Sequence, residues 1–145
     1  MRELPRQLTA EQLTELFEGR TRFVELLATV EDPLGQARTL ARELTDAEKK
    51  DLLDAHPVIG AKASSARSAA EQGTDDDPQV LAELAGLNRT YEERFGFRFV
   101  VFVNRRPRRE IVPVLRERLE RTREQELDTA VDELVQIAVD RWQRS

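Results

Sequence analysis

The sequence predicts an all-α fold: a single-domain, multi-helical bundle over residues 1–145, with a short irregular or extended buried segment near residues 97–103. Helix-start signals recur along the chain, and apolar residues follow them at the three- and four-residue spacing of one helical face. A length of 145 residues is ordinary for one domain with one hydrophobic core. Only the segment 97–103 departs from the helical pattern.

The first half of the chain predicts four helices. Their start signals are two capping boxes, Thr9-x-x-Gln12 and Thr45-x-x-Glu48, and a proline, Pro33. Gly19 predicts the end of the first helix, and the helix after the second capping box runs toward residue 56. The apolar residues at helical spacing are Leu13, Leu16 and Phe17; Phe23, Val24, Leu26 and Leu27; Leu34, Ala37, Leu40 and Ala41; and Leu52 and Leu53.

The second half predicts three more helices. Acids favour the positive end of a helix dipole and proline favours the first helical position, so Asp75-Asp76-Asp77-Pro78 predicts a helix start. We expect this helix to stop near Gly96. The three apolar stripes are Val80, Leu81, Leu84, Leu87 and Tyr91; Ile111, Leu115 and Leu119; and Leu127, Val131, Leu134, Ile137 and Ala138, ending at Trp142.

The segment 97–103 is rich in β-branched and aromatic residues, which favour a strand. A single strand has no partner in a helical chain, so we expect either extended backbone threaded through the core or a short buried helix. In the first case its N–H and C=O groups need partners, and a polar heterocycle with amide-like edges would supply them. A purely structural core segment is the commoner case.

Composition excludes several classes of function. The chain has no cysteine and one histidine, which argues against disulfides, thiolate chemistry and a zinc site of the common kind. A net charge of −5 argues against nucleic acid, and no apolar run is long enough to cross a membrane. No apolar run follows Met1, so we expect no signal peptide. Charged residues make up 35% of the chain and are well mixed in sign, which predicts a cytoplasmic protein. The basic cluster Arg105–Arg109 predicts either a solvated loop before a helix or a rim that attracts an anionic substrate.

His56 is the leading candidate for chemistry. It is the only histidine, and histidine has an unperturbed pKa of roughly 6.5, close to neutral pH. Pro57 moves His56 away from helical geometry and Gly60 permits a sharp turn, so we expect His56 at a helix end. Taken alone, such a histidine is more often a structural residue than a proton carrier.

Two other features allow a structural and a functional interpretation. Ser68 and Glu71 have capping-box spacing, which indicates a helix start; alternatively, that start faces a ligand, and Glu71 orients His56. Arg141 near the end of the last helix complements the helix dipole if exposed. If it points inward, its guanidinium group would bind a substrate carboxylate.

Four motifs occur in order: His-Pro-x-Ile-Gly, Ser-x-x-Glu-Gln, Phe-Gly-Phe-x-Phe-Val-x-x-Val, and an arginine in the last helix. From about residue 13 to residue 142, the chain resembles the 2-oxo-4-hydroxy-4-carboxy-5-ureidoimidazoline (OHCU) decarboxylase family. The resemblance implies an all-α enzyme with no metal or organic cofactor, commonly a homodimer. The implied reaction is decarboxylation of this small anionic heterocycle to (S)-allantoin, the last step of urate oxidation.

The resemblance also implies a set of site residues. His56 matches the catalytic histidine and Glu71 the essential acid. The substrate-binding positions that match are Pro57, Ser68, Ala69, Ala70, Glu71, Gln72, Phe99, Val100, Val101, Phe102, Val103 and Arg141.

The chain departs from the family pattern in one place. Fifteen positions separate His56 from Glu71, a shorter segment than in the family. Two alternatives therefore accompany the decarboxylase hypothesis: a family member that acts on another ureido acid or oxidised purine, and a non-enzymatic helical interaction module in which the histidine motif is structural.

Overall fold

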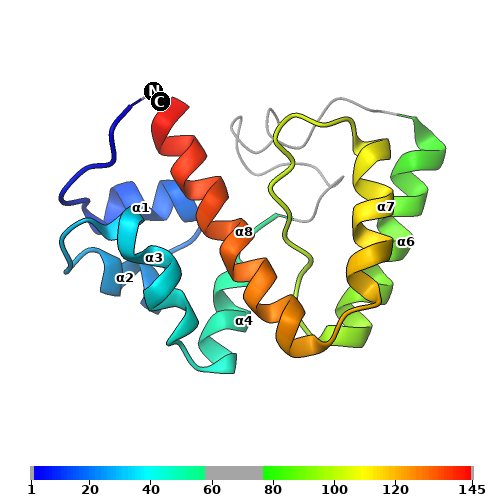
Figure 1. The fold of residues 1–145 in the computed structure, drawn as a ribbon, viewed down its shortest axis with the longest axis horizontal. Helices are drawn as coiled ribbons and strands as arrows, with labels where there is room; N and C mark the ends of the chain where they lie inside the picture. Colours follow the sequence, from blue (N-terminus) through cyan, green and yellow to red (C-terminus); the bar gives the residue numbers. More distant parts are fainter. Residues whose placement is uncertain (1, 58–76, 145) are drawn as a thin grey trace.

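The computed structural model describes residues 2–57 and 77–144, and this part of the chain is helical with no strand. The prediction of an all-α fold is therefore confirmed (Figure 1). The helices are α1 (Ala10–Phe17), α2 (Arg22–Leu27), α3 (Pro33–Arg42), α4 (Asp46–Asp54), α6 (Pro78–Phe95), α7 (Arg108–Leu119) and α8 (Arg123–Arg144). No helix in the described ranges is long and apolar enough to cross a membrane.

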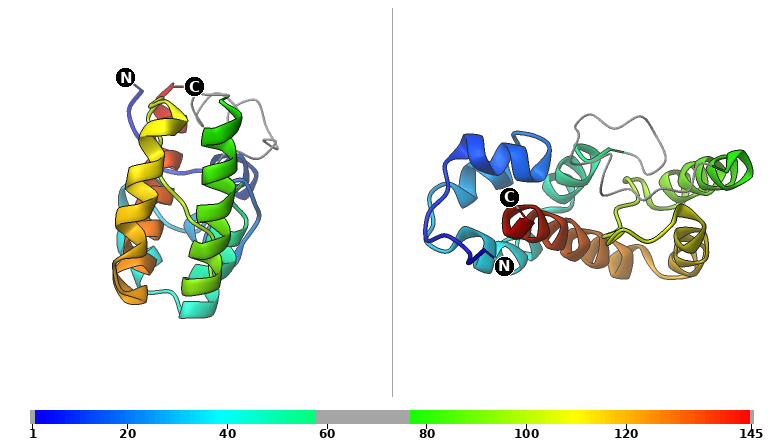
Figure 2. Two further views of the ribbon diagram at one scale, coloured as in Figure 1. Left: turned by 90° about the vertical axis from the view of Figure 1, so that its right-hand side faces the viewer. Right: turned by 90° about the horizontal axis from the view of Figure 1, so that it is seen from above.

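The long C-terminal helix α8 organises the fold. It packs against α1, α3 and α4, while α6 and α7 pack against each other. Figures 1 and 2 show α1, α2 and α3 gathered on one side of α8 and the α6–α7 pair on the other. Near the end of α8, Arg141 donates a hydrogen bond to the carbonyl of Leu16 in α1. This contact contributes to the site described below.

Local signals account for the helix starts. Thr9 and Thr45 each form a complete capping box with the residue three positions later, as predicted. Asp77 accepts a hydrogen bond of 2.9 Å from the backbone N–H of Gln79, and Pro78 is the first residue of α6. These caps satisfy N–H groups that have no partner within the helix.

The first helix ends one residue earlier than predicted. Glu18, not Gly19, takes the left-handed conformation at the end of α1, with φ of 63°. Gly19 is required for another reason: a Cβ atom at this position would lie 2.9 Å from the Cβ of Ala55. The absence of a side chain at Gly19 lets the end of α1 approach the end of α4.

The segment 97–103 is neither helix nor strand and lies in the core, so the extended alternative is correct and the short buried helix is wrong. Arginine side chains bind its backbone. Arg118 donates to the carbonyl of Val100 at 2.6 Å, and Arg106 donates to the carbonyl of Phe102 at 2.8 Å. These bonds replace those that a neighbouring strand would supply.

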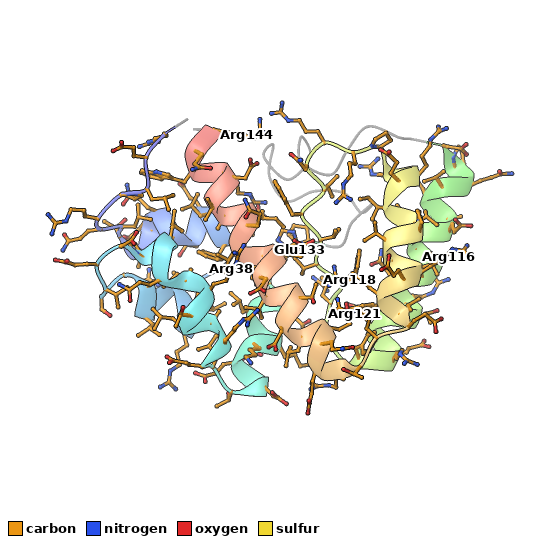
Figure 3. All side chains as sticks on the ribbon, in the orientation of Figure 1. Arg38, Arg116, Arg118, Arg121, Glu133 and Arg144 are labelled. Atoms are coloured by element: carbon orange, nitrogen blue, oxygen red, sulfur yellow. The ribbon has the colours of Figure 1, made fainter. Side chains whose placement is uncertain are left out.

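A buried polar network supports this segment from α7 and α8. The carboxylate of Glu126 accepts from Tyr91 at 2.6 Å and from Arg118 at 2.7 Å. The guanidinium carbon of Arg118 also lies 4.6 Å from the ring centre of Phe99. Arg118 therefore links α7, α8 and the segment, and Figure 3 shows its position between them.

Candidate active site

His56 lies just beyond the end of α4, as the sequence predicts. Ala55 caps the helix, and the backbone N–H of His56 donates to the carbonyl of Leu53 at 3.1 Å. The side chain is partly buried, and its Nδ1 atom is buried with no hydrogen-bond partner in the structure. Pro57, a predicted substrate contact, follows in non-helical backbone and is also partly buried.

The surroundings of His56 favour its neutral form. Burial lowers the pKa of His56 from 6.5 to about 4; the guanidinium groups of Arg141 and Arg98 add to this lowering, while the Glu18 carboxylate opposes it. On this basis the imidazole is uncharged at pH 7, and its free ring nitrogen can accept a proton.

Arg98 connects His56 to the extended segment. Its Nη1 atom donates to the carbonyls of Asp54 at 2.9 Å and His56 at 2.7 Å. Its backbone N–H donates to the carboxylate of Asp54 at 3.1 Å. Because Phe99 is the next residue, this arrangement brings two predicted parts of the site together, the end of α4 and the segment 97–103.

The backbone of the segment 97–103 is already engaged at several points. The carbonyls of Val100 and Phe102 accept from arginines, as described above, and the carbonyl of Val103 accepts from Arg106 at 2.9 Å. The N–H of Phe102 lies 3.4 Å from the carboxylate of Glu133 on α8. Figure 3 shows Glu133 on the side of α8 that faces this segment. Substrate binding by these particular groups would have to share or replace such bonds.

Arg141 points into the protein and is 3% exposed. Its Nη1 atom donates to the carbonyl of Leu16 at 2.8 Å and lies 3.4 Å from a carboxylate oxygen of Glu18. The inward orientation is the one that the functional interpretation of Arg141 requires. Its role in binding a carboxylate stays a prediction.

The predicted Ser68, Ala69, Ala70, Glu71 and Gln72 lie outside the described residues. The described part of the site therefore consists of His56, Pro57, the segment 97–103 and Arg141. Within that part, no cluster of three or more histidine, cysteine, aspartate or glutamate side chains could hold a metal ion.

Sequence reasoning missed two residues of this region. Arg98 binds the His56 carbonyl from 42 positions away, and Glu18 pairs with Arg141 across the interface between α1 and α8. Arg98 occupies an unspecified position of the Phe-Gly-Phe-x-Phe motif, and Glu18 belongs to none of the motifs. The prediction that the basic cluster Arg105–Arg109 lies in a loop before a helix is only partly correct, because Arg108 and Arg109 are the first residues of α7. Arg106 precedes the helix but folds back onto the segment 97–103 instead of extending into solvent.

Comparison with known families gives a consistent result. The sequence model of the family described as OHCU decarboxylase matches residues 2–143. A protein of Haloferax volcanii named 2-oxo-4-hydroxy-4-carboxy-5-ureidoimidazoline decarboxylase is 34% identical over 113 residues, covering 74% of this chain and 67% of that protein. A protein of the same name from Halalkalicoccus jeotgali is 30% identical over 112 residues, covering 72% and 64%.

A longer relative and a solved structure extend the comparison. The uric acid degradation bifunctional protein PucL of Bacillus subtilis is 29% identical over 150 residues; the alignment covers 95% of this chain but 30% of that protein. A crystal structure of an OHCU decarboxylase in the presence of (S)-allantoin superposes with a TM-score of 0.76 at 25% identity, covering 90% of this chain and 94% of the other.

Proposed function

We propose that the chain, which belongs to the OHCU decarboxylase family, converts 2-oxo-4-hydroxy-4-carboxy-5-ureidoimidazoline to (S)-allantoin without a cofactor. The observation that carries the proposal is the environment of His56. Its imidazole has an unpartnered, buried ring nitrogen and lies close to the buried Arg141. The matched structure that was determined in the presence of (S)-allantoin supports the same substrate class.

The proposed reaction needs one residue that moves protons near neutral pH. The substrate has a carboxylate on a carbon that also bears a hydroxyl group, next to a C=N bond. The bond to the carboxylate breaks, CO2 leaves, and the electron pair moves toward the C=N bond. Protonation of the resulting enol-like intermediate on one face then gives one enantiomer.

The lowered pKa of His56 suggests the order of these steps. An uncharged imidazole at pH 7 is a base, so we infer that His56 first accepts the proton of the substrate hydroxyl group. The imidazolium that forms is then the acid that returns this proton to the carbon of the intermediate, and the nitrogen that received the electron pair takes a proton from water. Partial burial of His56 limits exchange with water, which favours protonation on one face.

Arg141 and Glu71 have supporting roles in this proposal. Arg141 is the buried cation beside His56, and a cation there would attract the carboxylate of the substrate. Glu71 would stabilise the imidazolium form of His56, and Ser68, Ala69, Ala70 and Gln72 would bind the substrate with Pro57 and residues 99–103. We also propose a homodimer and a cytoplasmic location, with no nucleic-acid or membrane partner.

Freshly generated substrate tests the proposal. The purified protein should produce optically active allantoin faster than buffer, as measured by circular dichroism. His56→Ala should lower kcat by about 100-fold or more. Asp51→Asn, an exposed change on the preceding helix α4, should retain the parent rate. Parent-level activity of His56→Ala would contradict the assigned role of the histidine.

The short His56-to-Glu71 segment supports a second candidate, a family member with another substrate. Fifteen positions separate the two residues. A melting-temperature shift with a different ureido acid or oxidised purine, and none with allantoin-like compounds, would favour this candidate.

A further inference from the structure

Among the described residues that act on the charge of His56, Glu18 is the acid. We propose that Glu18 is a positioning residue of the candidate site: its carboxylate holds the guanidinium of Arg141 against the end of α1 and balances its charge beside His56. For its catalytic meaning, this inference rests on the proposed function.

The geometry at the end of α1 fixes the pair. Glu18 Oε1 lies 3.4 Å from Arg141 Nη1, and the same nitrogen donates to the carbonyl of Leu16 at 2.8 Å. The side chains of Glu18 and Arg141 are 7% and 1% exposed. An ion pair so shielded from water interacts strongly, which holds both side chains in place. Removing either partner would leave an uncompensated buried charge.

The backbone places this pair beside His56. Glu18 precedes Gly19, where an added Cβ atom would lie 2.9 Å from the Cβ of Ala55. Ala55 in turn precedes His56. The ends of α1 and α4 thus approach each other at Gly19 and Ala55. The residues next to these two, Glu18 and His56, interact electrostatically.

Within residues 2–57 and 77–144, charged groups on three elements act on His56. Arg141 approaches from α8 and Arg98 from the segment 97–103, and both lower the pKa of His56. Glu18 of α1 acts in the opposite direction. On α4 itself, the carboxylate of Asp54 is bound by Lys50 and by the backbone N–H of Arg98. Among these described groups, Glu18 is therefore the acid that keeps the histidine basic enough to accept a proton beside two guanidinium groups.

The expected effects of substitution have opposite signs. Glu18→Gln keeps the size and a hydrogen-bonding oxygen but removes the negative charge, so the pKa of His56 should fall by about one unit. Arg141→Gln removes the positive charge, so the pKa should rise by about one unit. The double variant should lie close to the parent. A role limited to packing would not produce shifts of opposite sign.

The single histidine makes the measurement direct. Imidazole resonances in the NMR spectrum of this chain can come only from His56. Because the pKa of the parent is about 4, titration of each variant from pH 8 down to about pH 2 reports its pKa. Glu15→Gln is the matched control, because Glu15 is an exposed acid on the same helix. Shifts of the same sign for Glu18→Gln and Arg141→Gln, or a Glu18→Gln shift no larger than that of Glu15→Gln, would overturn the proposal.

Two further measurements keep the test decisive. Circular dichroism checks folding, and Glu18→Asn serves as a second charge-removing variant because asparagine accepts the left-handed conformation well. Loss of folding in both variants would assign Glu18 to the stability of α1 and overturn the proposal. In the enzymatic assay, the acidic limb of the pH profile of kcat/KM should move to lower pH in Glu18→Gln. Because the NMR titration needs no substrate, its outcome is independent of whether the parent protein is active on OHCU.

Discussion

Arg98 holds His56 by its backbone: Nη1 of Arg98 donates a hydrogen bond of 2.7 Å to the carbonyl oxygen of His56. The same nitrogen binds the carbonyl of Asp54. The last carbonyl groups of a helix lack partners within the helix, so this guanidinium acts as a cap at the end of α4. It also fixes the distance between the histidine and the segment 97–103.

Replacement of Arg98 should therefore affect both stability and catalysis. Arg98→Met keeps the side-chain length and loses the donors to Asp54 and His56, so unfolding should become easier by about 2 kcal/mol in urea denaturation. Displacement of His56 should also lower kcat/KM by roughly tenfold or more. Arg89→Met, an exposed change on α6, is the control. Equal losses in both variants would contradict a specific role for Arg98.

The contact between Gly19 and Ala55 predicts a suppressor pair. Gly19→Ala places a Cβ atom 2.9 Å from that of Ala55, so it should destabilise the protein by about 1–3 kcal/mol and displace His56. Ala55→Gly removes the opposing atom and should restore both stability and activity in the double variant. Gly86→Ala serves as the control, because nothing lies within 4 Å of its added Cβ and helix propensity alone should stabilise it. No recovery in the double variant would rule out this contact as the cause.

The pKa of His56 predicts how stability changes with pH. The pKa is about 4 in the folded state against 6.5 ordinarily, so between these values the unfolded chain binds the proton and the folded protein does not. The contribution of neutral His56 to the free energy of unfolding has its full value above pH 6.5. It declines as the pH falls toward 4. The decline amounts to about 2 kcal/mol between pH 7 and pH 5.

His56→Asn isolates this contribution, because asparagine does not titrate. Urea denaturation at pH 7 and pH 5 should show a smaller loss of stability for His56→Asn than for the parent, while all carboxylates contribute equally to both. Identical losses would mean that the histidine is not buried in its neutral form.

Local signals in the sequence predicted the helix starts well. The caps at Thr9 and Thr45 and the proline at residue 78 act within three or four residues, so their effect can be read directly from spacing. The position of His56 at a helix end follows from the same kind of signal, because Pro57 acts on the residue before it.

Long-range contacts explain what the sequence left open. Propensity alone could not choose between an extended and a helical segment at 97–103, since the choice depends on Arg118 and Arg106. The functions of Glu18 and Arg98 likewise depend on partners far along the chain. The expected roles of Ser68, Ala69, Ala70, Glu71 and Gln72, and the single-domain organisation over residues 1–145, stay predictions.

The way in which the segment 97–103 is held has an evolutionary consequence. In a sheet, a shift of one residue moves every side chain to the opposite face, so changes in one strand constrain its neighbours. Here separate side chains bind individual carbonyls, with Arg118 at Val100 and Arg106 at Phe102. Selection can therefore alter this part of the proposed site one residue at a time, and substrate preference can diverge between relatives while the helical scaffold is retained.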